Sequence, residues 1–311
     1  MNYLERYING EQQQVWAELI AMGGNIRKET LYREAYAVVR ETMRRVRHNI
    51  ETLVARLNQL GFEFVNTPFE PPNPDFLENI TMLEDEAGLL PLSLKVFYQE
   101  VGYVNFMGNH PLLCEYVKPA GNEMAVDFLN LYRKEIGPVP DTGNPTLQSA
   151  RLSFGMLGEL LKNMSQPGGY KPDSKLDNFA QSLEKMFTRP ASQPQQVVPD
   201  VYTDPLVVDP PYEDDLEAYQ RYDAEGNETE GFTVEIAPDI CHKHGYSGGG
   251  PLEIYFPDEA IDAQIQGDEG YGYFVEYLRN CFKWGGFPGL KNSKTPPATE
   301  LAFLTKDLLG I

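Results

Sequence analysis

A short polar run, DICHKH, contains Asp239, His242 and His244, whose side chains are suited to metal chemistry. Imidazole nitrogens and carboxylate oxygens are good ligands for zinc and similar first-row metals. Ligands this close in sequence usually need another from a distant segment, and His110 is the candidate. A zinc-like ion on these four residues would indicate a metal-dependent hydrolase built around Asp239, His242 and His244. The alternative is a polar loop with hydrogen-bonded histidines and no cofactor.

Other motifs that suggest catalysis lack the context that catalysis requires. Residues 213–215 are adjacent acids, but two carboxylates can divide acid and base roles only if their environments differ. Residues 248–250 are three glycines, yet neither Gly-Lys-Ser/Thr nor a helix start follows, so a phosphate-binding loop is not indicated. We therefore assign no catalytic residue from sequence.

Four aromatic residues, Tyr271, Tyr273, Trp284 and Phe287, cluster near one predicted helix. Exposed aromatic residues often anchor protein interfaces, and large exposed apolar patches mark partner sites. The same residue types are also ordinary core residues. The cluster is therefore either a partner-binding site or part of the core, depending on its exposure.

Two strands and a helix must position these side chains. Alternating residues predict one strand at 231–236, and residues 252–256 predict a second. The loop between them, 237–251, contains the candidate metal residues and can join antiparallel neighbours. Apolar residues recur at helical spacing over 271–282, and the glycines and proline of 285–289 end that helix.

A long helix over residues 30–60 is the clearest element of the N-terminal part, after a shorter helical segment at 3–22. Its apolar positions recur in alternating steps of four and three, which is the pattern of a seam with a partner helix. Two interpretations remain open. The seam packs on its own domain, or it forms a structural homodimer through Val39, Val46, Ile50, Leu53 and Leu57.

The remaining elements complete an α+β fold: a small, mainly antiparallel sheet flanked by helices. Residues 1–66 form an N-terminal helical arm, and prolines make 68–74 a rigid linker. Residues 67–115 and 196–311 form the α+β domain, with further helices at 75–87, 213–223 and after Thr295. Three predicted helices separated by prolines and glycines make 116–195 a helical insertion.

Charge and cysteine content restrict the functional class. Net charge is −20, and residues 1–60 carry 9 Lys and Arg against 7 Asp and Glu, whereas the remainder carries 17 against 39. This acidity argues against nucleic-acid binding and favours a basic protein partner. Three widely spaced cysteines, with no apolar run long enough to span a membrane, lead us to expect a cytoplasmic protein.

The order of these elements resembles the SUKH superfamily, which contains bacterial immunity proteins and a fungal cell-wall synthesis regulator. The resemblance covers residues 75–115 and 200–285. Its motifs are Leu90-Pro91, Leu94–Tyr98, Val101-Gly102, strands near Leu206 and Val234, Gly249–Tyr255 and Tyr273–Leu278. The N-terminal arm and the insertion are additions to the usually compact family domain.

The resemblance implies an α+β module that binds proteins and often neutralises a toxin, with no shared catalytic residues. Our first hypothesis is therefore a non-catalytic interaction module, of the type of an immunity protein that neutralises a toxin or enzyme. The alternatives are the metal-dependent hydrolase and the structural dimer held by the 30–60 helix.

Overall fold

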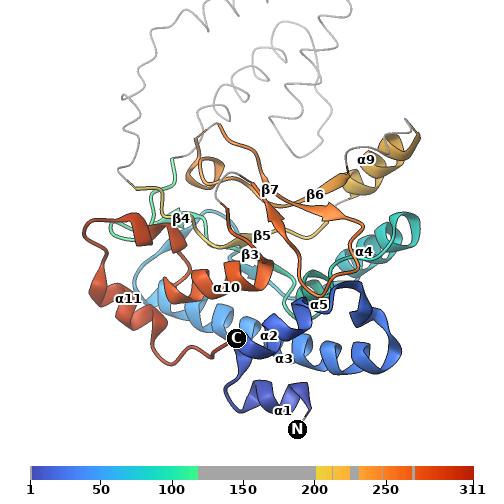
Figure 1. The fold of residues 1–311 in the computed structure, drawn as a ribbon. Coiled ribbons are helices and arrows are strands. Elements are labelled where there is room, and N and C mark those ends of the chain that lie inside the picture. The colour runs from blue at the N-terminus through green and yellow to red at the C-terminus, as the bar shows by residue number, and fades with distance from the viewer. Residues whose placement is uncertain (1, 118–200, 212, 225–230, 247, 268–269) are drawn as a thin grey trace, which may run out of the picture. The chain divides into compact units, whose positions relative to one another are not determined.

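The computed structural model describes residues 2–117, 201–211, 213–224, 231–246, 248–267 and 270–311 (Figure 1). The chain divides into one unit of Met1–Val117 with Pro199–Ile311 and another of Lys118–Val198. The description below concerns the first unit, which has the predicted α+β fold with small antiparallel sheets. The helical insertion predicted for 116–195 lies almost entirely outside the described residues.

The N-terminal helices are α1 (Tyr3–Ile8), α2 (Gln12–Ile20), the 3-10 turn η1 (Gly23–Arg27) and α3 (Glu29–Gln59). The segment predicted as one helix at 3–22 is thus two helices. Gly10, at φ +107°, lies at the break, in a conformation that favours glycine. The Arg6 guanidinium then ties α1 to α2 through two hydrogen bonds to the Glu18 carboxylate, at 2.7 and 2.8 Å.

The long helix α3 lies below the sheets in the view of Figure 1, and most residues of its heptad seam are buried within the unit. The seam contacts α1, α5 and α11 of the same chain. The five residues proposed for a homodimer are each 0% exposed within one chain: Val39, Val46, Ile50, Leu53 and Leu57. Of the two interpretations of the heptad pattern, the structure shows the intramolecular one, because these side chains already pack against their own chain.

Eight short strands form the antiparallel sheets of the described residues. One sheet has the order β2 (Phe69–Glu70), β3 (Tyr103–Asn105), β5 (Val207–Val208), and another β6 (Phe232–Ala237), β7 (Leu252–Phe256), β8 (Ile265–Gln266). A third pairs β1 (Glu63–Phe64) with β4 (Gly108–Asn109). The Asp209 N–H donates to the Ile236 carbonyl at 2.8 Å, so β5 runs alongside β6. Strand β2 lies inside the segment predicted as a rigid proline linker.

The remaining helices cover the sheets and complete the core. They are α4 (Pro74–Ala87), α5 (Leu92–Glu100), α9 (Glu213–Ala224), η2 (His242–His244), α10 (Phe274–Lys283), η3 (Pro288–Asn292) and α11 (Ala298–Thr305). Figure 1 shows α5 and α10 between the sheets above and α3 below, and α4 beside α9 at one edge. Among the described residues, no helix is both long and apolar enough to cross a membrane.

Buried Asp262 caps α10 from outside the helix. The Val275 N–H, in the first turn of α10, lies 3.4 and 3.3 Å from the two Asp262 carboxylate oxygens. The Ser93 hydroxyl donates to the same carboxylate at 2.7 Å. A carboxylate at this position satisfies helix N–H groups that have no partner within the helix. Burial nevertheless raises the pKa of Asp262 to about 7.

Candidate functional site

Asp239 shapes the turn that carries the predicted metal ligands. Its Oδ1 accepts hydrogen bonds from the Cys241 N–H at 2.7 Å and the His242 N–H at 3.2 Å, and Oδ2 contacts His242 Nδ1. Its carbonyl accepts from the Lys243 N–H at 3.0 Å. An aspartate that binds the next backbone N–H groups stabilises a turn, as a helix N-cap does. Asp239 is 2% exposed and is therefore a structural residue of this turn.

The glycine-rich loop lies against the same carboxylate. A Cβ built on Gly249 would lie 2.8 Å from Asp239 Cγ, and Gly249 has φ +83°. Only glycine fits such a close approach in this backbone conformation without strain. The loop therefore packs against Asp239. This contact accounts for the glycine at position 249, so a phosphate ligand is not needed to explain it.

His244 is buried, and both of its ring nitrogens bind the main chain. Nδ1 lies 2.8 Å from the Glu115 carbonyl, so it carries the proton and donates. Nε2 lies 3.0 Å from the Thr203 nitrogen and 3.3 Å from the Asp204 nitrogen, so it accepts from both N–H groups. Burial lowers the pKa of His244, which agrees with a neutral ring. A metal ion would have to displace one of these bonds.

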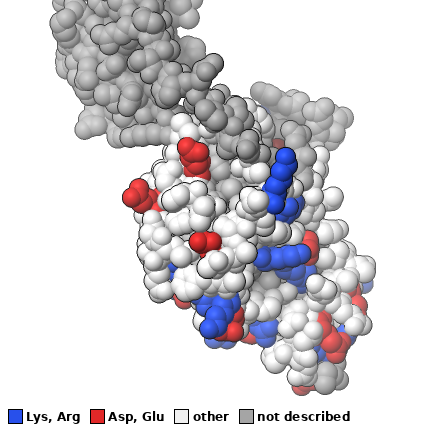
Figure 2. Space-filling view, turned by 90° about the vertical axis from the view of Figure 1, so that its left-hand side faces the viewer, with Lys and Arg blue, Asp and Glu red and all other residues white. Residues whose placement is uncertain are grey.

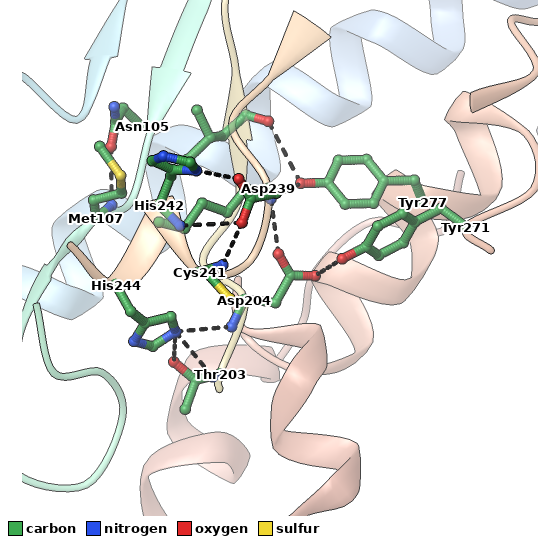
Figure 3. A network of polar contacts seen from close by, with 12 residues as sticks. Asn105, Met107, Thr203, Asp204, Asp239, Cys241, His242, His244, Tyr271 and Tyr277 are labelled. Atoms are coloured by element: carbon green, nitrogen blue, oxygen red, sulfur yellow. Dashed lines mark hydrogen bonds and ion pairs between the residues drawn. The ribbon is translucent and has the colours of Figure 1, made fainter. Parts of the chain in front are cut away.

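Lys243, next to His244 in the sequence, forms a buried ion pair with Asp204. Figure 3 shows Asp204 together with Tyr271, Tyr277 and His244. Lys243 Nζ lies 2.7 Å from Asp204 Oδ1 and 3.3 Å from the Tyr277 hydroxyl oxygen. The Tyr271 hydroxyl donates to Asp204 Oδ2 at 2.5 Å. Lys243 is 0% exposed, and burying a lysine requires such a partner. Asp204 has φ +52°, which aspartate tolerates better than most residues.

The fourth predicted ligand, His110, contacts its own segment and Phe62. Its Nδ1 accepts from the Leu112 N–H at 3.3 Å, and its ring stacks on Phe62 with centroids 6.4 Å apart. His110 and His244 line one open pocket of about 610 Å³, together with Glu63. His242 does not line it.

The four predicted ligands do not assemble into a metal centre. Among the described residues, no group of three or more His, Cys, Asp or Glu side chains is placed to hold a metal ion. Within the set, the contact is between Asp239 and His242, whereas His244 and His110 each bind main-chain groups. The interpretation of a polar loop with hydrogen-bonded histidines agrees with these contacts.

The predicted aromatic site is dispersed. Phe287 is 0% exposed and packs on Phe62 with centroids 5.5 Å apart, so it belongs to the core. Trp284 is half-buried against the same core, and Tyr271 binds Asp204. Tyr273 is exposed, at 39%. These four residues therefore do not form one exposed aromatic surface.

Carboxylates are frequent at exposed or half-buried positions of α4 and α9, which contact each other, and of β6 and β7. We call these residues the acidic surface, and they are Asp75, Glu78, Asp85, Glu86, Glu217, Asp223, Glu235 and Glu253. The α4 sequence contains no Lys or Arg, and that of α9 contains one, Arg221. On the opposite side of the unit, where β4 and α11 lie, Lys and Arg are interspersed with Asp and Glu (Figure 2).

Like charges face each other within the acidic surface. Glu235 on β6 and Glu253 on β7 are directly opposite in the strand register. Burial and then the charges of Asp215 and Glu253 raise the pKa of Glu235. Burial and then the Glu235 charge raise the pKa of nearby Asp209 to about 7. Directly opposed like charges destabilise a sheet, so this face is electrostatically costly for the chain alone.

Comparisons with known proteins add no relative: no family model, no curated protein and no solved structure matches the chain. The resemblance to the SUKH superfamily therefore depends on the sequence features alone.

Sequence reasoning missed the buried pair of Lys243 and Asp204. Lys243 lies in a polar run that is typical of an exposed loop, and Asp204 is 39 residues away in the chain. No sequence feature near either residue indicates that the two pair. The one available indication was the strand expected near Leu206, which brings Asp204 next to the sheet.

Proposed function

We propose that this chain is a non-catalytic protein-binding module whose partner is a basic protein, as an immunity protein binds and neutralises a toxin or enzyme. The observation that carries the proposal is the acidic surface. Its carboxylates come from α4 and α9, which contact each other, and from the paired strands β6 and β7, of which β6 contacts α9. A surface of one sign attracts a partner of the other sign and accelerates their association.

The environment of Asp239 and His244, two of the three residues of the hydrolase alternative, and of the neighbouring Lys243 supports a non-catalytic role. Asp239 binds the backbone N–H groups of its own turn, and both ring nitrogens of His244 bind the main chain. Lys243 is fully enclosed with Asp204. A general base must reach the proton that it removes, and these groups are already engaged within the fold.

The opposed glutamates indicate how a basic partner gains affinity. A Lys or Arg placed between Glu235 and Glu253 would relieve their mutual repulsion. The Tyr255 side chain, 52% exposed on the same strand as Glu253, offers an aromatic contact beside the charges. Tyrosine and arginine are frequent at the centres of protein interfaces.

Two further observations accord with this proposal. The resemblance to the SUKH superfamily implies a protein-binding module of the immunity type. Cys114, Cys241 and Cys281 are not joined in disulfides, which agrees with a reducing compartment. We accordingly place the interaction in the cytoplasm.

The test uses the full chain as bait in lysate of its own host, with native mass spectrometry to give the partner's identity and stoichiometry. The purified partner is then titrated with the wild-type chain and with the double variant Asp85→Lys/Glu86→Lys. The matched control is Glu29→Lys/Glu51→Lys, which makes the same charge change at exposed positions of α3.

We expect the α4 variant to weaken the Kd by about tenfold or more, which corresponds to about 1.4 kcal/mol, and the control to change it much less. The association rate of the wild-type chain should fall as salt is added. Equal effects of the two variants would show that the acidic surface is not the interface. A chain with no partner and a hydrolytic activity lost in His242→Ala would overturn the proposal entirely.

A further inference from the structure

His244 contacts the chain on both sides of the segment 118–200. Before this segment, Nδ1 donates to the Glu115 carbonyl at 2.8 Å, and the Val117 N–H donates to the His244 carbonyl at 3.0 Å. After it, the Thr203 and Asp204 N–H groups both donate to Nε2. One residue therefore joins two strips of main chain that are separated by more than 80 positions in the sequence.

The residue after His244 makes the same junction tight. A Cβ built on Gly245 would lie 1.7 Å from the Val117 carbonyl oxygen, and Gly245 has φ +78°. The backbone of Val117 thus passes directly over the backbone of Gly245, with no room for a side chain. The junction is fixed by main-chain contacts as well as by the imidazole.

We propose that His244 is a pH-sensitive clamp that holds together the two points at which the chain leaves and re-enters this unit. This inference is independent of the proposed function. In the neutral tautomer, one nitrogen donates and the other accepts, as the junction requires. Protonation turns Nε2 into a donor, so it can no longer accept from the Thr203 and Asp204 N–H groups. The acceptor that it then faces is the Thr203 hydroxyl oxygen, at 3.4 Å. The Glu115 side of the clamp keeps its hydrogen bond in both states.

The charges around the His244 ring have opposite effects on its pKa. Asp204 and Glu115 favour the protonated ring, Lys243 disfavours it, and burial, the largest effect, lowers the pKa of His244. Tyr202 packs edge-on against the ring at 5.4 Å between centroids. Glu63, His110 and Cys114 line the adjoining pocket.

The direction of the pH effect follows from these surroundings. The folded-state pKa lies below the ordinary histidine value of about 6.5, so the ring is neutral at pH 7. The clamp is therefore complete above about pH 6.5 and is lost as the pH falls through the lower, folded-state pKa. We expect release below about pH 6.5, as the pH falls through the folded-state pKa.

The test measures amide hydrogen exchange of the full chain by NMR between about pH 7.5 and 4.5, corrected for the intrinsic pH dependence. Protection of the Thr203 and Asp204 amides should fall about tenfold or more on acidification. Protection of Leu53, a buried residue of α3, reports global unfolding and should not fall on acidification, because the raised pKa values of Asp262 and Asp209 stabilise the folded chain as the pH falls. Unchanged protection at Thr203, or a loss that merely parallels Leu53, would overturn the proposal.

Two variants separate the two sides of the clamp. In His244→Gln, the amide oxygen replaces the Nε2 acceptor, so protection at Thr203 should persist and lose its pH dependence. In His244→Asn, the shorter amide retains a donor near Glu115 but no acceptor near Thr203, so protection there should be low at every pH. A His244→Gln chain that keeps the wild-type pH dependence would assign the switch to another group. If a variant fails to fold, the wild-type experiment still tests the proposal. In that experiment, the nitrogen chemical shifts of His244 report the tautomer and the protonation state of the ring.

Discussion

The side chain of Asn49 forms two hydrogen bonds with the main chain of Leu309. Asn49 Nδ2 donates to the Leu309 carbonyl at 2.9 Å, and the Leu309 N–H donates to Asn49 Oδ1 at 2.8 Å. Asn49 is fully buried in the middle of α3. From the same helix, Arg45 binds the Gly310 carbonyl and Arg56 the Leu304 carbonyl, at 2.9 and 2.7 Å. The C-terminal segment is thus held on α3 largely through its own main chain.

Removal of the Asn49 side chain should destabilise the protein and release this segment. Asn49→Ala leaves the Leu309 N–H and carbonyl without their partner, and a buried unsatisfied group costs about 1–3 kcal/mol. Urea unfolding of this variant should show that loss, whereas Asn58→Ala, at an exposed position of the same helix, should cost less than about 1 kcal/mol. Equal losses would contradict the importance of the pair.

An aspartate introduced into the α3 seam should unfold the chain, because the seam belongs to the core of a single chain. Ile50 and Leu53 are 0% exposed, so Ile50→Asp or Leu53→Asp buries an unpaired carboxylate and removes core contacts. We expect a loss of more than about 4 kcal/mol, seen as lost circular dichroism and an expanded species on size-exclusion chromatography. A folded chain of half the original mass would instead indicate a dimer seam.

Replacing either member of the buried pair of Lys243 and Asp204 should destabilise the protein. Replacing both should cost less free energy of unfolding than the sum of the two single losses. Lys243→Met leaves the Asp204 carboxylate enclosed with Tyr271, and such a loss costs about 3–5 kcal/mol. Asp204→Asn retains a residue that tolerates φ +52°. The double variant should therefore unfold at a urea concentration above that expected from adding the two single losses. Strict additivity would show that the pair is not coupled.

Asp262 should make the protein less stable as the pH rises towards neutrality. Burial raises the pKa of Asp262 to about 7, above the unfolded value of about 3.9. The folded state therefore binds the proton more tightly, and the resulting stability is present below the unfolded pKa and is lost as the pH rises through about 7. Asp209 acts in the same direction, so only a comparison with a variant isolates Asp262.

The measurement is the free energy of unfolding at pH 5 and pH 8, for the wild type and for Asp262→Asn. The wild type should lose more stability than the variant, by on the order of 3 kcal/mol, at about 1.4 kcal/mol per pKa unit. Asp85→Asn, at an exposed position, is the control and should follow the wild type. Parallel curves for the wild type and Asp262→Asn would contradict the raised pKa.

Elements with strong periodicity were predictable from sequence. The heptad spacing located α3, and the alternation of residues located β6 and β7. Strand β2 was missed because a two-residue strand has no periodicity, and the surrounding prolines favour a linker. Phe287 was ambiguous because an aromatic residue at a helix end suits both a core and an interface.

The polar contacts were the least predictable part of the site. Asp239 and His242 are three positions apart, so their contact is local and was anticipated as a shared loop. Lys243 and His244 depend on partners at positions 204 and 115, which only the folded chain brings close. Acidic composition indicated a charged surface, but the opposition of Glu235 and Glu253 depends on strand register, which the sequence left open.

The junction at His244 has a consequence for how the length of this protein can change. Closing a loop costs entropy that grows only with the logarithm of its length, so each doubling adds about 0.6 kcal/mol. Because Glu115 and Thr203 bind one imidazole, the ends of the intervening segment are already held together by the folded unit. Segments much shorter or longer than residues 118–200 can therefore begin and end at this point with little effect on the stability of the rest. The position is suited to gaining, losing or exchanging a whole domain during evolution.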